Sequence, residues 1–202
     1  MDLIIKNLGA TPYEETWQMM KDYIAHNPSQ DEIWITEHPA IFTTGLNKKD
    51  IKIPDSDIPH VFVDRGGKIT YHGPGQVIVY LLINLLKNQL TIRQLVSIIE
   101  KSIIELLIKN NIKGHSKKEA PGVYVLEKKI ASIGLRIKNN FTYHGLSLNV
   151  AMDLSPFLLI SPCGIDNLEM TQVSDLNKDY NNSEIISELT KLLQFNLSMH
   201  HE

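Results

Sequence analysis

The chain contains one cysteine, Cys163, in the sequence Ser161-Pro162-Cys163-Gly164. A lysine, Lys129, opens an apolar stretch further upstream that runs to Arg136. A thiol reacts as its thiolate, and a neighbouring amine can remove its proton or stabilise the charge that forms. If the fold brings the two side chains together, the pair can carry an acyl group as a thioester. The alternatives are a cysteine that serves as a small buried hydrophobe and a lysine at a solvated strand position.

A second candidate site is the glycine-rich segment Arg65 to Gln76, between two expected strands. Its glycines permit unusual backbone angles and let main-chain N–H groups approach a ligand, as a narrow slot for an extended chain requires. We expect Arg65 and His72 to face a polar head group, with Ile69 and Tyr71 lining the pocket. The alternative is a structural turn. The segment contains neither the GxxxxGK[ST] phosphate loop nor the GxGxxG dinucleotide fingerprint.

Length and composition favour one domain over residues 1–202, because 202 residues with 43% apolar content can bury one substantial core. The formal net charge of −3 gives no polybasic signature, so we expect neither nucleic-acid nor membrane binding. A single cysteine excludes an intramolecular disulfide, and CxxC and HExxH spacings are absent, which favours a reducing compartment, the cytoplasm, and no metal. No signal sequence is evident at Met1, and the longest apolar runs are too short to span a bilayer.

Hydrophobic periodicity predicts an α+β fold with a mixed, mostly antiparallel sheet flanked by helices, which we place on one side of it. A capping box at Thr11 and an amphipathic pattern from Thr91 predict helices to Ala25 and Lys109. Asn182-Ser183 can cap a last helix that ends near Leu197. The expected strands cover residues 3–8, 33–36, 60–63, 75–86, 122–126, 129–137 and 141–150, the fourth of them buried in the middle of the sheet and the last two joined as a hairpin.

Three stretches, in this order, resemble one protein family: Arg65 to Gln76, Lys129 to Arg136, and Pro162-Cys163-Gly164 downstream of Gly145-Leu146-Ser147-Leu148-Asn149. Glu37-His38-Pro39 with Phe42-Thr43-Thr44-Gly45 is similar to an early segment of the same family. The family is that of the lipoyl(octanoyl) transferases, or octanoyl-[acyl-carrier-protein]:protein N-octanoyltransferases. The resemblance extends from about Trp34 to Asp175 and keeps the order of the motifs.

The resemblance implies the fold of the biotin and lipoate protein ligases, with no cofactor. It implies that Cys163 forms the acyl thioester and that Lys129 acts as acid and base. The substrate-binding residues that it implies are Arg65, Gly66, Gly67, Lys68, Ile69, Thr70, Tyr71, His72, Ser132, Ile133, Gly134, Gly145, Leu146 and Ser147.

The implied donor is octanoyl-acyl carrier protein. The implied acceptors are lipoyl domains of 2-oxoacid dehydrogenase complexes or the H protein of glycine cleavage, and the implied oligomeric state is a monomer. We expect Arg65, Lys68, Arg136 and Lys138 to form a basic patch that meets acidic carrier domains. Burial should select the acyl length, with a steric wall at the end of the pocket that the sequence does not identify.

Physical chemistry fits this reaction, because exchange of one thioester for another has little free-energy cost and the amide formed next is more stable. Three alternatives remain. One is an ATP-dependent lipoate or octanoate protein ligase, or another cysteine-dependent amidotransferase, of the same fold. The second is a cysteine hydrolase with His72 or His144 as base. The third is a non-catalytic docking module for carrier domains.

Overall fold

A computed structural model describes residues 3–161 and 168–201 of the chain. The predicted nucleophile, Cys163, lies outside the described residues. Within them, no helix combines the length and the apolar character needed to cross a membrane.

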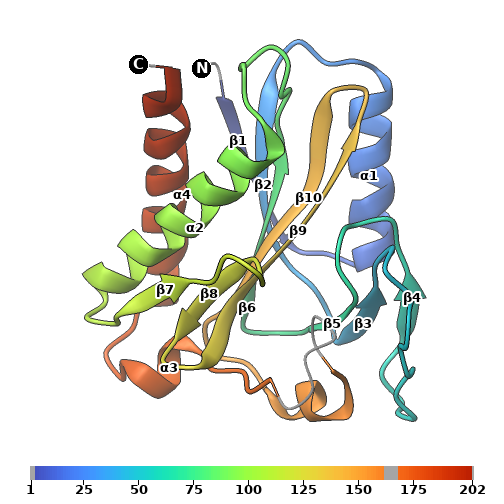
Figure 1. The fold of residues 1–202 in the computed structure, drawn as a ribbon, viewed down its shortest axis with the longest axis vertical. Coiled ribbons are helices and arrows are strands. Elements are labelled where there is room, and N and C mark those ends of the chain that lie inside the picture. Colours follow the sequence, from blue (N-terminus) through green and yellow to red (C-terminus); the bar gives the residue numbers. More distant parts are fainter. Residues whose placement is uncertain (1–2, 162–167, 202) are drawn as a thin grey trace.

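The strands form two sheets (Figure 1). The larger has the order β1-β2-β6-β10-β9-β8-β7, and among its described strands β1 and β2 pair in parallel while the other neighbours are antiparallel. Its strands are β1 Leu3–Ala10, β2 Asp31–Glu37, β6 Gln76–Leu82, β7 Gly114–Ser116, β8 Gly122–Val125, β9 Lys128–Lys138 and β10 Phe141–Asn149. The smaller has the order β4-β3-β5, with β3 Ile41–Thr44, β4 His60–Phe62 and β5 Ile69–His72. The mixed, mostly antiparallel sheet of an α+β fold is thereby confirmed.

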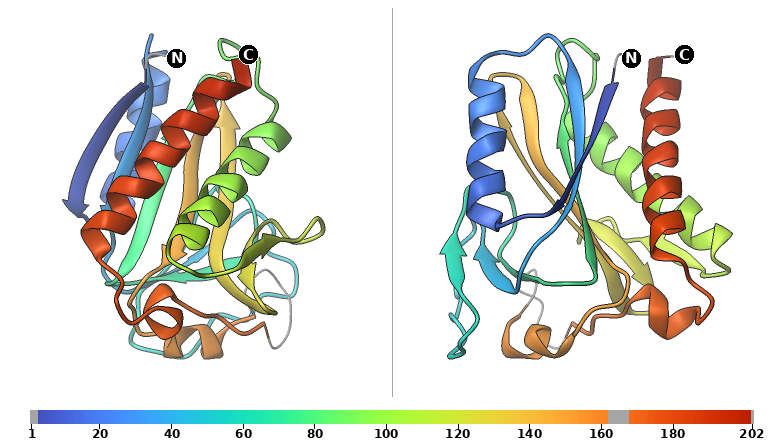
Figure 2. Two further views of the ribbon diagram at one scale, coloured as in Figure 1. Left: turned by 90° about the vertical axis from the view of Figure 1, so that its left-hand side faces the viewer. Right: turned by 180° about the vertical axis from the view of Figure 1, so that it is seen from behind.

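Helices cover both faces of the large sheet, so their expected placement on one side is wrong. The helices are α1 Tyr13–Ala25, α2 Ile92–Lys109, α3 Val173–Leu176 and α4 Asn182–Ser198, with 3₁₀ helices η1 Ser155–Leu159 and η3 Met199–His201. In Figure 2, α2 and α4 lie on one side of the sheet and α1 on the other. Met20 and Ile24 of α1 pack on Trp34 and Tyr80, side chains that the pleat directs away from α2.

The main core lies between the sheet and the pair α2 and α4. It takes alternate residues of the strands, such as Val77, Val79 and Leu81 of β6, with the apolar stripe of α2. The central, doubly covered strand is confirmed, although β6 is shorter than the expected span 75–86. Its other alternate residues, among them Ile78 and Tyr80, face α1 and the small sheet.

Helix caps differ from the predictions in detail. Thr91 and Gln94 form the capping box of α2. The side chain of Asn181, one residue earlier than expected, caps α4 by accepting the N–H of Glu184. Helix α1 has no side-chain cap, because the Thr11 hydroxyl instead bonds the hydroxyls of Thr16 and Thr36.

Candidate active site

A β-bulge places Lys129 on the α1 side of the sheet. Val123 of β8 pairs with Ala131, whereas the next residue, Tyr124, pairs with Lys129, so Ile130 is an extra residue in β9. Ile130 and Ala131 both enter the main core on the α2 side. Because β9 alternates again from this point, Lys129 shares the opposite face with Ser132 and Gly134.

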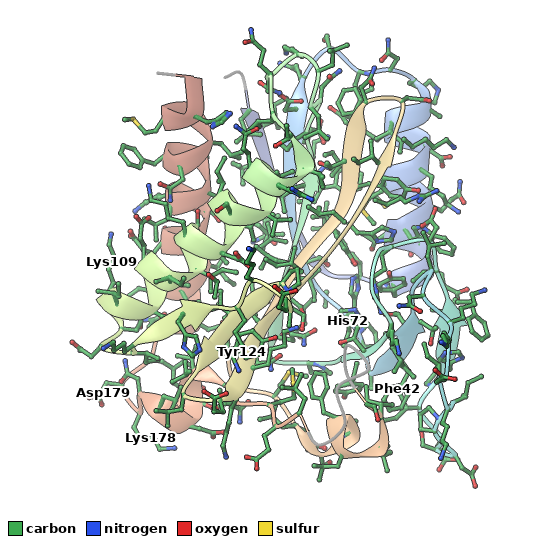
Figure 3. The ribbon with its side chains drawn as sticks, viewed as in Figure 1. Phe42, His72, Lys109, Tyr124, Lys178 and Asp179 are labelled. Atoms are coloured by element: carbon green, nitrogen blue, oxygen red, sulfur yellow. The ribbon has the colours of Figure 1, made fainter. Side chains whose placement is uncertain are left out.

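The side chain of Lys129 is completely buried, at 0% exposed. Its amine lies 5.3 Å from the centroid of the Tyr124 ring (labelled in Figure 3). Its backbone N–H donates to the Glu169 carbonyl, and its carbonyl accepts the Thr171 N–H, both at 2.9 Å. Gly122 leaves room for the lysine stem, since a Cβ there would lie 2.6 Å from Lys129 Cε. This burial excludes a solvated strand position for Lys129, and it is unusual, because lysines are almost never fully buried.

The glycine-rich segment folds over β9 and is held by backbone contacts. The Gly66 N–H donates to the Leu135 carbonyl at 3.0 Å. Across the contact, a Cβ on Gly134 would lie 3.2 Å from the Gly66 carbonyl oxygen, so both chains approach closely because neither carries a side chain there. The segment from Arg65 to Thr70 thus becomes one wall of a slot and the β9–β10 hairpin becomes the other.

Arg65 has a structural role in this wall. Its guanidinium donates to the Thr43 hydroxyl from Nε at 3.2 Å and from Nη2 at 2.8 Å, to the Thr43 carbonyl at 2.7 Å and to the Gly66 carbonyl at 2.9 Å. Only 8% of Arg65 is exposed, so its expected membership of a basic surface patch is wrong. Lys138 lies at the far end of β9, roughly 30 Å along the strand from Lys129.

A cavity lies between the glycine-rich segment, the hairpin and the first turn of α1. It brings together all but one of the predicted substrate-binding residues. The residues that line it are Tyr13, Arg65, Gly66, Gly67, Lys68, Ile69, Thr70, His72, Ile78, Tyr80, Ser132, Ile133, Gly134, His144, Gly145, Leu146 and Ser147.

The exception is Tyr71, which does not line this cavity. Its ring packs on Phe42 and Phe157, each with centroids 5.5 Å apart, in a separate cluster beneath the small sheet. The prediction of Tyr71 as a lining residue is wrong because its ring packs into this separate cluster, whereas its neighbours Thr70 and His72 line the cavity.

Four lining residues were not predicted as substrate-binding: Tyr13, Ile78, Tyr80 and His144. Period-two alternation along β6 could have identified Ile78 and Tyr80, because both face away from the main core. His144 was considered only as a possible base. It adopts φ 59° within β10, an uncommon conformation for a residue with a side chain.

Aromatic rings form the inner wall of the cavity. Tyr13 stacks on His72 with centroids 5.7 Å apart, and it meets His38 edge-on at 5.1 Å. Tyr80 lies 5.8 Å from His38 and 6.3 Å from His144. Figure 3 labels His72, the last residue of β5.

Burial keeps the histidines of this wall neutral. Burial lowers the pKa of His72 to about 3, helped by the nearby His38 and opposed by a hydrogen bond to Gln76. It also lowers the pKa of His38, and it lowers that of His144 although Asp64 opposes the shift. The wall therefore carries no histidine charge near neutral pH.

Asp64 anchors the base of this wall. Its carboxylate accepts hydrogen bonds from Trp17 Nε1 at 2.9 Å, Tyr143 Oη at 2.5 Å and His144 Nε2 at 3.0 Å. Burial alone would raise the pKa of Asp64, but the bonds from His144, Tyr143 and Trp17 outweigh it and hold the pKa well below its usual range. Since His144 donates from Nε2 and is neutral, its buried Nδ1 is an acceptor, and no donor among residues 3–161 and 168–201 bonds to it.

A second groove adjoins the cavity at Lys68 and Ile69. Ser161 and Leu168, the described residues on either side of 162–167, both line it. Glu169, which follows, is the residue whose carbonyl accepts the Lys129 N–H. Among residues 3–161 and 168–201, no three histidine, cysteine or acidic side chains are arranged to hold a metal ion.

The fold places the chain in a structural class. A bipartite lipoate protein ligase from Thermoplasma acidophilum superposes with a TM-score of 0.76, at 12% identity, over 98% of this chain and 84% of that one. A biotin protein ligase from Aquifex aeolicus, in complex with biotin and ATP, gives 0.63 at 17% identity, over 98% and 70%. The chain thus has the biotin and lipoate protein ligase fold.

Sequence comparison narrows this class to a family. The model of the lipoyl protein ligase A/B catalytic domain matches residues 12–194. An octanoyltransferase of Shewanella oneidensis is 45% identical, over 99% of this chain and 95% of the relative, and one of Chromobacterium violaceum is 46% identical, over 100% and 99%. The chain belongs to the lipoyl protein ligase A/B catalytic domain family, among relatives named octanoyltransferase.

Proposed function

We propose that this protein is an octanoyltransferase, which moves an octanoyl group from acyl carrier protein, through a thioester on Cys163, to a lysine of a lipoyl domain. The observation that carries the proposal is the fully buried amine of Lys129 on the same sheet face as a cavity lined by the glycine-rich segment and the β9–β10 hairpin. The names of the relatives indicate the same reaction.

The first step exchanges thioesters. The Cys163 sulfur forms a bond to the donor's carbonyl carbon, the donor carbon–sulfur bond breaks, and the thiol proton passes by way of Lys129 to the departing carrier thiolate. Because one thioester replaces another, the step has little free-energy cost and needs no ATP. The covalent intermediate allows two large partners to use the site in turn.

The second step forms the amide. The acceptor lysine attacks the acyl-enzyme carbonyl as a neutral amine, its surplus proton passes to Lys129, and the Cys163 thiolate leaves. In this proposal the buried Lys129 amine lies beside the reacting carbon, because general acid–base catalysis requires a positioned group within reach of both protons.

The cavity supplies binding energy for the acyl chain. Seven methylene and methyl groups buried at ~0.8 kcal/mol each give on the order of 5 kcal/mol. The glycines of the two walls, Gly66 and Gly67 on one and Gly134 on the other, suit such a ligand, because backbone without side chains allows a narrow slot for an extended chain.

Mass spectrometry of the Cys163 peptide tests the covalent step. Purified protein mixed with octanoyl carrier protein alone should gain an octanoyl adduct on that peptide, and an apo lipoyl domain should discharge it without ATP. Cys163→Ser should show no thioester adduct. Transfer that requires ATP would instead indicate a ligase, and a Cys163→Ser variant with full transfer would exclude the proposed intermediate.

A matched pair of lysine variants tests the amine. Lys129→Met keeps the buried volume and removes the proton-carrying group, so the fold should be retained while transfer falls by ~10²–10⁴-fold. Lys128→Met is the control, because Lys128 is exposed and pairs with Glu169 at 2.6 Å on the surface. Its transfer rate should stay within about twofold of wild type, as surface pairs contribute little. Equal losses in both variants would contradict a special role for Lys129.

We also propose that residues 1–202 act as one domain and as a monomer in the cytoplasm, with lipoyl domains or the glycine cleavage H protein as acceptors. Sedimentation of the purified protein tests the oligomeric state. Competition between the two acceptors for the octanoylated enzyme tests the preference.

A further inference from the structure

The cavity-facing side chains of the large sheet form successive rows across its strands. Strand registers align Ile78 of β6 with Ser147 of β10 and Ser132 of β9, and further along they align Tyr80 with Gly145 and Gly134. All six residues line the cavity. Along β9, Lys129 precedes Ser132 of the first row, so the first row lies between Lys129 and the second row. Four strand steps separate Lys129 from Gly134 once the bulge is discounted, which is ~13 Å.

In the second row, Tyr80 stands beside two glycines. Gly134 and Gly145 contribute only backbone, so the Tyr80 ring is the side chain that those three strands place across the slot at this depth. The space behind Tyr80 is filled, because its own cluster continues into Met20, Trp34 and Leu82, which are at most 3% exposed. The Tyr80 ring therefore closes the cavity on the β6 side.

A buried hydrogen bond holds the ring in place. The Tyr80 hydroxyl lies 2.6 Å from His38 Nε2, and His38 Nδ1 lies 2.7 Å from the Thr11 carbonyl. A carbonyl only accepts, so Nδ1 carries the proton of the neutral imidazole and Tyr80 donates to Nε2. With 4% of its surface exposed and its hydroxyl bonded, Tyr80 cannot rotate out of the slot.

We propose that Tyr80, held by His38, is the specificity-determining residue that sets the length of the acyl chain. This inference rests on the proposed function, because it assumes an acyl chain attached near Lys129 that extends toward Gly134. The chain's last carbon then meets the Tyr80 ring. A longer chain has no space behind the ring, and a shorter one leaves part of the slot unfilled.

Acyl-length competition tests the inference. Hexanoyl, octanoyl, decanoyl and dodecanoyl carrier proteins are offered together, and the transferred products are counted by mass spectrometry. Tyr80→Val should raise the decanoyl-to-octanoyl ratio by on the order of tenfold, since each additional buried methylene is worth about fourfold. Tyr80→Phe keeps the ring and should shift the ratio by no more than about threefold.

Ile78→Val is the matched control. It removes volume from the neighbouring row of the same strand, beside the chain and not beyond it, so its length ratios should stay close to those of wild type. If Tyr80→Val does not fold, Tyr80→Trp moves the wall toward Lys129 and should favour hexanoyl over octanoyl.

The outcomes separate the two proposals. Wild-type protein that transfers no octanoyl group overturns the proposed function. Wild-type transfer, together with Tyr80→Val and Tyr80→Trp ratios equal to those of wild type, overturns the assignment of Tyr80 alone. A decanoyl-to-octanoyl ratio that rises equally in Ile78→Val and Tyr80→Val also overturns it, because general loosening would then explain the change.

Discussion

Replacement of Gly45 by alanine should displace a cavity wall that the residue itself does not line. A Cβ at this position would lie 2.5 Å from the Gly67 carbonyl oxygen, 2.7 Å from that of Arg65 and 2.9 Å from that of Gly66. All three are backbone atoms, so no side-chain rotation relieves the contact. To restore van der Waals separation, the segment carrying these carbonyls must move by roughly 0.9 Å.

This shift breaks a defined set of bonds. The N–H groups of Gly45, Leu46 and Asn47 donate to the carbonyls of Lys68, Arg65 and Gly67 at 3.0–3.2 Å. At ~1 kcal/mol each, their loss with residual strain should lower the free energy of unfolding by ~2–4 kcal/mol. Octanoyl transfer should fall at least ~10-fold, since a displacement near 1 Å can reduce a rate by as much as ~10²-fold.

Urea denaturation and the octanoyl adduct assay measure the two effects. Gly9→Ala is the control, because a Cβ at Gly9 would have no heavy atom of the described part of the chain within 4 Å. Its φ of 66° gives a backbone strain of ~1–2 kcal/mol, but transfer should match wild type. A Gly45→Ala protein with wild-type transfer and less than ~0.5 kcal/mol of destabilisation would refute the reasoning.

Three further predictions follow from the contacts of the site. Gly122→Ala places a Cβ 2.5 Å from the Ala131 carbonyl oxygen and 2.6 Å from Lys129 Cε, at φ 134°; urea denaturation should show a loss of at least ~2 kcal/mol, and adduct formation should fall as the amine moves. Asp64→Ala removes the acceptor of two buried donors, Tyr143 and His144, and of the half-buried Trp17, so thermal melts should show ~3 kcal/mol of destabilisation, partly restored in Asp64→Asn. His72 has a pKa of about 3 in the folded protein, against an ordinary value of 6.5, so below pH 6.5 the unfolded chain binds more protons, and the free energy of unfolding decreases by up to ~1.4 kcal/mol for each unit by which the pH is lowered. His72→Gln should flatten this slope. An unchanged slope between pH 6 and 4 would show that His72 does not titrate as a buried histidine.

Elements with strong periodicity were predicted correctly from the sequence. Helix α2 follows from its apolar stripe and the Thr91 cap, and the β9–β10 hairpin from two apolar runs around a polar turn. The small sheet was largely missed. Strands β3 and β5 have only four residues each, and β5 lies inside the glycine-rich segment, where turn-forming residues obscure the alternation.

The segments that form the site were predicted from the sequence, but the burial of Lys129 and the place of Tyr80 in the cavity were not. The family resemblance predicted that the glycine-rich segment and the two hairpin strands share one binding surface, and the structure brings these segments together around the cavity. The burial of Lys129 could not be predicted, because it depends on a bulge at Ile130 and on space left by Gly122 across the strand pair. Tyr80 was not predicted because it lies in a uniformly apolar strand, where the pattern predicts that a tyrosine belongs to the hydrophobic core.

Burial gives the inner wall its chemical character. His38, His72 and His144 would ordinarily titrate near neutral pH, and a positive charge on any of them would stand beside the proposed acyl chain. Because the wall is closed to water, the charged forms are disfavoured and the pKa of each is lowered. The neutral rings can then make polar contacts to one another, such as the bond between His38 and Tyr80, without repelling an apolar ligand. The burial that lowers these pKa values therefore also keeps this part of the cavity suitable for a hydrocarbon chain.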